Sequence, residues 1–137
     1  MNKLSEEYIE LMKEAMKYRE NAYVPYSKFK VGAAILTEEG KIYGGCNIEN
    51  ASYGATNCAE RTAIFKAVSE GVRKISAIAI IGDVNAITYP CGICRQVILE
   101  FGDKDVDVIV FTSLENYEVI KLENILPYAF TKLDLSK

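Results

Sequence analysis

The apolar and polar positions of the chain follow helical spacing in some segments and strand spacing in others. Ser5, two acidic residues and then apolar residues every three or four positions predict a helix that begins after Ser5 and ends near Ala22. Residues 23–27 are expected to form a loop. Residues 29–36 and 42–48 are largely apolar and flank a Glu-Glu-Gly turn, so they predict a β-hairpin.

The middle of the chain predicts a second helix and a buried strand. Thr56 or Asn57 is expected to cap a helix that runs to about Ser69 and is stopped by Gly71. The continuous apolar run of residues 75–81 then predicts a strand that is buried on both faces, as in parallel sheets.

The last third of the chain predicts a helix over residues 91–101 and a strand over residues 106–111. Only residues 112–117 separate that strand from the next one, at residues 118–121. This connection is too short for a parallel crossover, so the two strands are expected to pair antiparallel. Residues 122–130 predict a short final helix.

The resulting order, α-β-β-α-β-α-β-β-α, predicts the α/β class and a three-layer α/β/α domain built on a mixed five-stranded sheet. The length of 137 residues suits one globular domain. The sequence contains no internal repeat, linker or low-complexity segment, so residues 1–137 are expected to form a single domain.

Composition narrows the range of functions. The net charge of −3 provides no large basic surface for a nucleic-acid polymer. No apolar run approaches the roughly 20 residues of a membrane span, and residues 1–13 are charged, without the apolar core of a signal peptide. We therefore expect a cytoplasmic protein that binds no membrane, in which the four cysteines are metal ligands, catalytic groups or core residues.

Two short motifs carry the candidate chemistry. Cys58 and Glu60 begin the second predicted helix, and Cys91 and Cys94 begin the third. The strands that precede these helices are expected to be neighbours, which would bring the three sulfurs together. Three thiolates with an open fourth position are typical of catalytic zinc. Because the chain has no histidine, acid–base chemistry near neutral pH would depend on another group, such as a buried Glu60 with a raised pKa.

Each feature of this motif also has a simpler interpretation. Cys46 is either a fourth ligand, which would close the site into a structural one, or a buried apolar residue. Cys91 and Cys94 alone would suit a redox dithiol at a helix start. Arg61 either donates hydrogen bonds to the sulfurs and offsets their negative charge, or is a solvated helix residue.

The motifs resemble those of the small, homotetrameric class of zinc-dependent cytidine deaminases. Residues 58–61 (Cys-Ala-Glu-Arg) and 90–96 (Pro-Cys-Gly-Ile-Cys-Arg-Gln) resemble the zinc motifs of that class. Residues 25–34, 45–54 and 126–130 resemble its first strand, its ribose-binding segment and its tail. The likeness extends over about residues 5–131, and Tyr128 stands where the tail motif usually has a small residue.

The resemblance implies hydrolytic deamination of cytidine and deoxycytidine to uridine and deoxyuridine with release of ammonia, a step of pyrimidine salvage. It implies one zinc per chain, held by Cys58, Cys91 and Cys94. Hydroxide on the zinc would attack C4 of the ring. Glu60 would carry the water proton to ring N3 and then protonate the departing amine.

The resemblance also implies substrate contacts. Phe29 would stack on the pyrimidine, or else be an ordinary core aromatic. Asn47 and Glu49, two positions apart on one face of a strand, would bind the ribose hydroxyls, or else face solvent. The backbone N–H of Ala59, at a helix start, would bind the base carbonyl.

A further group of residues is implied to act between subunits of a homotetramer with shared active sites. Ala51, Tyr53 and Phe130 would complete the pocket of a neighbouring subunit. Arg95 and Gln96 would support the metal loop or an interface, and Gln96 would orient Arg61.

Three rival functions stay open at this point. An aminonucleoside-antibiotic deaminase of the blasticidin type shares the zinc motifs, although Phe29, Asn47 and Glu49 favour plain nucleosides. A non-catalytic zinc or nucleoside-binding protein would need neither an open zinc position nor Glu60. A thiol redox protein would need neither the third cysteine nor the glutamate.

Overall fold

The computed structural model describes residues 4–136, so the first three residues of the charged N-terminal stretch and the last residue of the chain lie outside it. The sheet has five strands in the order β2-β1-β3-β4-β5. The β3–β4 pair is parallel and the other pairs are antiparallel, which confirms the predicted mixed sheet. The strands are β1 (Gly32–Thr37), β2 (Ile42–Cys46), β3 (Ile75–Ile81), β4 (Asp107–Ser113) and β5 (Asn116–Lys121).

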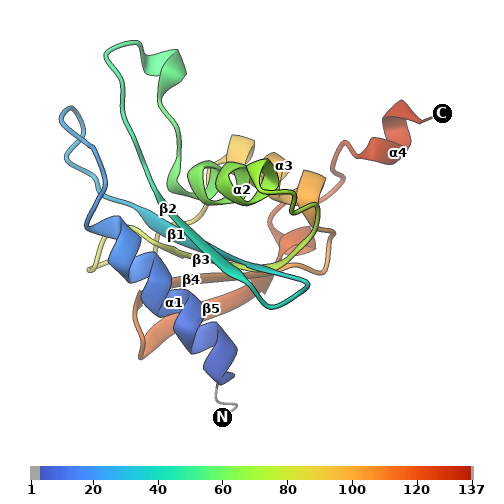
Figure 1. The fold of residues 1–137 in the computed structure, drawn as a ribbon, viewed down its shortest axis with the longest axis horizontal. Coiled ribbons are helices and arrows are strands. Elements are labelled where there is room, and N and C mark those ends of the chain that lie inside the picture. The colour runs from blue at the N-terminus through green and yellow to red at the C-terminus, as the bar shows by residue number, and fades with distance from the viewer. Residues whose placement is uncertain (1–3, 137) are drawn as a thin grey trace.

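Helices cover both faces of this sheet (Figure 1). Helix α1 (Glu6–Arg19) packs on one face, where its buried residues join a core with β1, β3 and β4. Helices α2 (Ala59–Ser69) and α3 (Gly92–Phe101) lie side by side on the other face and bury the larger core. The three predicted layers are therefore present. Across residues 4–136, no helix combines the length and apolarity that crossing a bilayer requires.

The first helix begins where the sequence predicts and ends slightly earlier. The Ser5 side chain accepts a hydrogen bond from Tyr8 N at 3.2 Å, which makes it the N-cap. The helix stops at Arg19 rather than near Ala22. The chain leaves the helix there because Tyr23 N donates to the backbone oxygen of Asn47, a bond that a continued helix would exclude.

The second helix is capped by a different residue from those expected. Cys58 is the N-cap of α2, whereas Asn57 donates from its side chain to Thr62 Oγ1 at 3.0 Å and Thr56 lies further upstream. The predicted cap was wrong by one or two residues because Asn57 pairs with Ile48 through two backbone hydrogen bonds. This pairing holds the chain extended up to Cys58.

The predicted final helix over residues 122–130 is wrong. The chain forms a short 3-10 turn, η2 (Leu122–Asn124), and a separate helix, α4 (Lys132–Leu135). Pro127 cannot continue a helix, and Tyr128 has a φ of 55°, in the left-handed region. In Figure 1 α4 extends away from the body of the protein.

Two glycines allow the helices to approach the sheet at backbone distance. A Cβ at Gly32 would lie 2.1 Å from the backbone oxygen of Ala15 in α1. A Cβ at Gly45 would lie 2.5 Å from the backbone N of Ala63 and 3.0 Å from the backbone oxygen of Ala59, both in α2. Gly45 therefore sets how closely the start of α2 sits against β2.

We predict that Gly45→Ala destabilises the protein by about 1–3 kcal/mol, because the added methyl group collides with helix backbone that cannot rotate away. Urea unfolding followed by circular dichroism measures the change. Gly54→Ala is the matched control, since a Cβ there meets nothing within 4 Å, and it should leave the midpoint unchanged. Equal midpoints for the two variants would contradict the prediction.

Candidate active site

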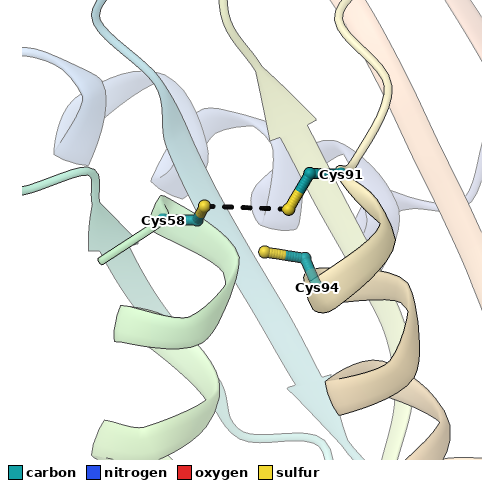
Figure 2. Close-up of side chains that lie close together, drawn as sticks. All are labelled: Cys58, Cys91 and Cys94. Atoms are coloured by element: carbon teal, nitrogen blue, oxygen red, sulfur yellow. Dashed lines mark hydrogen bonds between the residues drawn. The ribbon is translucent and has the colours of Figure 1, made fainter. Parts of the chain in front are cut away.

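The three cysteines of the two motifs meet at the starts of α2 and α3. Cys58 is the N-cap of α2, Cys91 is the N-cap of α3, and Cys94 lies in the first turn of α3. Figure 2 shows their sulfurs pointing toward one another. The Sγ atoms of Cys58 and Cys91 are 3.9 Å apart, and all three sulfurs lie within 4.8 Å of one another.

The route by which the sulfurs meet differs from the expected one. The strands that precede α2 and α3 are β2 and β3, and they are not neighbours, because β1 lies between them. The expectation that these two strands are adjacent was wrong. The sulfurs converge because α2 and α3 pack against each other on the same face of the sheet.

The geometry of the three sulfurs suits zinc. Tetrahedral coordination at a Zn–S distance of about 2.3 Å places neighbouring sulfurs about 3.8 Å apart, close to the Cys58–Cys91 separation. Within residues 4–136 the metal-capable group contains these three cysteines and not Cys46. Cys46 is instead a buried residue at the end of β2, where burial raises the pKa of its thiol. The group thus offers three protein ligands to a metal ion.

The sulfur group carries negative charge that Arg61 partly balances. Arg61 Nη2 donates to Cys58 Sγ at 3.2 Å. Hydrogen bonds from the Cys94 thiol and then from Arg61 hold the pKa of Cys58 well below its usual value, despite partial burial. The pKa of Cys94 is raised, chiefly because its thiol donates to Cys58.

Glu60 lies beside this group in a setting that suits proton transfer. It is in the first turn of α2 and only 4% exposed. Burial, with a smaller contribution from the charge on Cys58, raises the pKa of its carboxyl to about 7. A carboxyl with a pKa near the working pH both accepts and releases a proton readily.

The predicted ribose-binding residues lie past the end of β2, where their side chains hold the neighbouring loop. Asn47 Oδ1 accepts from Val31 N at 2.9 Å, and its Nδ2 donates to the backbone oxygen of Phe29 at 2.8 Å. Glu49 Oε1 accepts from the backbone N–H groups of Tyr26 and Ser27 at 3.0 and 3.1 Å, and Oε2 accepts from the Ser27 hydroxyl. Ser27 is not among the residues predicted for the site, and only this tertiary contact reveals it.

Phe29 is not an ordinary core aromatic. Phe29 lies before β1, which begins only at Gly32. The Asn47 side chain, rather than a neighbouring strand, bonds to the backbone of Phe29. Phe29 is 42% exposed. A cavity of about 400 Å³ lies next to this loop. It is lined by Tyr26, Ser27, Glu49, Asn50, Tyr53 and Thr56.

The residues predicted to act between subunits are exposed in the single chain. Tyr53, in the 3-10 turn η1 (Tyr53–Ala55), is 78% exposed and Phe130 is 58% exposed, and Ala51 is exposed as well. In Figure 1 η1 and the C-terminal segment project from opposite sides of the helical layer. The structure does not bring these side chains to the sulfurs of their own chain.

Gln96 and Arg95 hold the C-terminal segment. Gln96 Nε2 donates to the backbone oxygen of Phe130 at 2.8 Å, so the expected contact between Gln96 and Arg61 is replaced by a contact with the tail. Arg95 donates from Nε to the backbone oxygen of Pro90 at 2.8 Å and from Nη1 to that of Ile125 at 2.7 Å. Arg95 thus links the metal loop to the segment before the tail.

Comparison with known proteins agrees with the site. The sequence model of the family described as "Cytidine and deoxycytidylate deaminase zinc-binding region" matches residues 5–110. The chain belongs to the cytidine deaminase family. This membership confirms the predicted family of zinc-dependent enzymes.

Individual cytidine deaminases are similar over nearly the whole chain. That of Sporosarcina psychrophila is 54% identical over 92% of this chain and 93% of its own length, and that of Halalkalibacterium halodurans is 51% identical over 92% and 96%. The crystal structure of the cytidine deaminase from Burkholderia pseudomallei superimposes with a TM-score of 0.85 at 44% identity, covering 93% of this chain and all of that one. The α/β fold of this family member is thereby confirmed.

We predict that Cys91→Ser lowers the zinc content of the purified protein far below one ion per chain, because a hydroxyl is a much poorer zinc ligand than a thiolate. Plasma mass spectrometry of the dialysed protein measures the ratio of metal to chain. Cys46→Ser is the control and should keep the ratio of the unmodified protein, since Cys46 lies outside the sulfur group. Loss of zinc in the control alone would refute the assignment of the ligands.

Proposed function

We propose that this protein catalyses the hydrolytic deamination of cytidine and deoxycytidine to uridine and deoxyuridine, with release of ammonia, as a step of pyrimidine salvage. The observation that carries the proposal is the buried carboxyl of Glu60 beside three converging sulfurs. Three protein ligands is the number found in catalytic zinc sites, which keep a position for water. The names of the relatives, all cytidine deaminases, support the substrate.

The proposed chemistry divides between one zinc ion per chain and Glu60. When bound by Cys58, Cys91 and Cys94, zinc supplies the Lewis acidity that makes water nucleophilic near neutral pH. Glu60 accepts the proton of the attacking water and delivers it to ring N3. It then takes up the remaining proton of the former water, now a hydroxyl on C4, and passes it to the amine, which leaves as ammonia while the C4 carbonyl forms. A carboxyl with a pKa of about 7 is suited to both directions of transfer.

Arg61 balances charge in this scheme. Zinc with three thiolates is formally negative, which weakens its pull on the electrons of water. The guanidinium on Cys58 and the N-termini of α2 and α3 reduce that negative charge. The backbone N–H of Ala59, in the first turn of α2, is proposed to bind the base carbonyl.

The proposed ribose contacts use the donors and acceptors of Asn47 and Glu49 that are not engaged by hydrogen bonds to the loop. An amide offers two N–H donors, and Asn47 uses one of them within the described chain. A carboxylate accepts about four hydrogen bonds, and Glu49 accepts three from protein groups among residues 4–136. One donor and one acceptor remain, the complement of a hydroxyl group. Phe29, half-exposed at the same loop, is proposed to stack on the pyrimidine.

The assembly is proposed to be a homotetramer whose subunits share active sites. Exposed apolar side chains on the two projecting segments support it, namely Tyr53 on η1 and Phe130 and Leu133 on the tail. Phe130 and Leu133 line one hollow on the tail, and large apolar side chains grouped in this way mark interaction sites. Ala51, Tyr53 and Phe130 would then complete a neighbouring pocket. A monomer mass by light scattering would contradict this assembly.

We predict that Glu60→Gln retains zinc near the unmodified ratio but deaminates cytidine several orders of magnitude more slowly, because the amide keeps the size of the side chain and cannot carry the proton. The loss of cytidine absorbance measures turnover. Glu70→Gln, the same change at the exposed end of the same helix, is the control and should keep full activity. Full activity of Glu60→Gln would overturn its proposed role.

We further predict that cytidine is deaminated in preference to blasticidin S when the two compete in one assay, because Phe29, Asn47 and Glu49 together suit a plain nucleoside. Comparison of the two kcat/KM values checks this. A preference for blasticidin S would instead indicate an aminonucleoside-antibiotic deaminase.

A further inference from the structure

The loop that carries Phe29 contains a backbone conformation that its sequence disfavours. Lys28, between Ser27 and Phe29, has a φ of 63°, in the left-handed region. For a residue with a Cβ this conformation is roughly tenfold less populated than the ordinary ones. Such conformations persist where surrounding contacts hold them, and they cluster at functional sites.

Hydrogen bonds on both sides of Lys28 hold this conformation. On the N-terminal side, the Ser27 hydroxyl donates to Glu49 Oε2 and accepts from Phe29 N at 3.0 Å, so it bridges Glu49 and Phe29 directly. On the C-terminal side, Asn47 Nδ2 donates to the backbone oxygen of Phe29 at 2.8 Å. Lys28 N itself donates to the backbone oxygen of Val24 at 3.0 Å.

The Ser27 hydroxyl is the member of this network that touches both groups proposed to contact the nucleoside. Its bond to Glu49 is the largest of the effects that keep the pKa of that carboxyl below its usual value, so Glu49 stays charged. Its bond from Phe29 N fixes where the backbone of that residue turns. A single side chain therefore connects the ribose-binding carboxylate to the aromatic ring.

We propose that Ser27 is a positioning residue that holds the left-handed turn at Lys28 and thereby sets the Phe29 ring relative to Glu49 before the nucleoside binds. The inference rests on the proposed function, because it assumes that Phe29 and Glu49 contact the base and the ribose. It assigns Ser27 no contact with the reacting atoms. Stacking and ribose binding then depend on one preformed turn rather than on two independent side chains.

Removing the Ser27 hydroxyl is expected to weaken substrate binding and to leave the rate of the chemical step nearly unchanged. Ser27→Ala should raise the KM for cytidine about tenfold, leave kcat within about threefold, and leave zinc content unchanged, because the turn relaxes while the metal and Glu60 stay in place. Ser27→Thr keeps the hydroxyl and should restore the KM.

A double-variant comparison separates positioning from direct contact with substrate. Lys28→Ala keeps a Cβ and its penalty in the left-handed region, whereas Lys28→Gly removes that penalty. Ser27→Ala should therefore raise the KM about tenfold in the Lys28→Ala protein and at most about threefold in the Lys28→Gly protein. An equal rise in both backgrounds would mean that Ser27 acts on the substrate directly, and it would overturn the proposal.

The outcomes distinguish this inference from the proposed function. If the unmodified zinc-loaded protein does not deaminate cytidine, the proposed function fails. If it does and Ser27→Ala keeps the unmodified KM, only the positioning role fails. Should Ser27→Ala not fold by itself, the proposal predicts that it folds in the Lys28→Gly protein, where the turn no longer needs the hydroxyl; failure to fold there as well would overturn the proposal.

Discussion

The site depends on holding three cysteine sulfurs and the Glu60 carboxyl close together while offsetting the negative charge that these groups carry when ionised. Cys58 and Cys91 are the N-caps of two helices, so the positive ends of both helix dipoles face the group. Arg61 reaches back from the first turn of α2 to Cys58 Sγ. Because the proposed ligands, the proposed proton carrier Glu60 and the cation of Arg61 all lie at the starts of α2 and α3, the packing of those helices sets the geometry of the site.

The packing of α2 in turn depends on a position with no side chain. Gly45 in β2 lies against the backbone of α2 at Ala59 and Ala63. These residues belong to the first turns of the helix, which also carry Glu60. A larger residue would lift the start of this helix from the sheet. The edge strand thus contributes to the metal site although, among residues 4–136, none of its residues belongs to the sulfur group.

The proposed substrate contacts are arranged differently from the proposed metal ligands. Two of the proposed metal ligands, Cys58 and Cys91, cap α2 and α3, and Cys94 lies within α3. Phe29, Asn47 and Glu49 instead lie on irregular segments that bond to one another. In these segments side-chain hydrogen bonds hold the backbone in place, as backbone hydrogen bonds do in the helices and strands. They leave unused one N–H of Asn47 and one acceptor position of Glu49 among the described residues. Binding capacity and local order therefore come from the same polar groups.

The sequence by itself determined most of the elements before the tail, because helical and strand spacing, the Ser5 cap and the apolar run of β3 depend on neighbours along the chain. It also determined the ligand types, since a chain without histidine that begins two helices with cysteine leaves few other sites for zinc. Only the tertiary structure decided that β1 separates β2 from β3, that Cys46 stays apart from the other cysteines, and that Ser27 bridges Glu49 and Phe29. These facts depend on contacts between residues far apart in the chain, which local spacing does not encode. The tail was mispredicted for a local reason, because Pro127 interrupts a helix over 122–130; its placement against α3 by Arg95 and Gln96 is again a long-range contact.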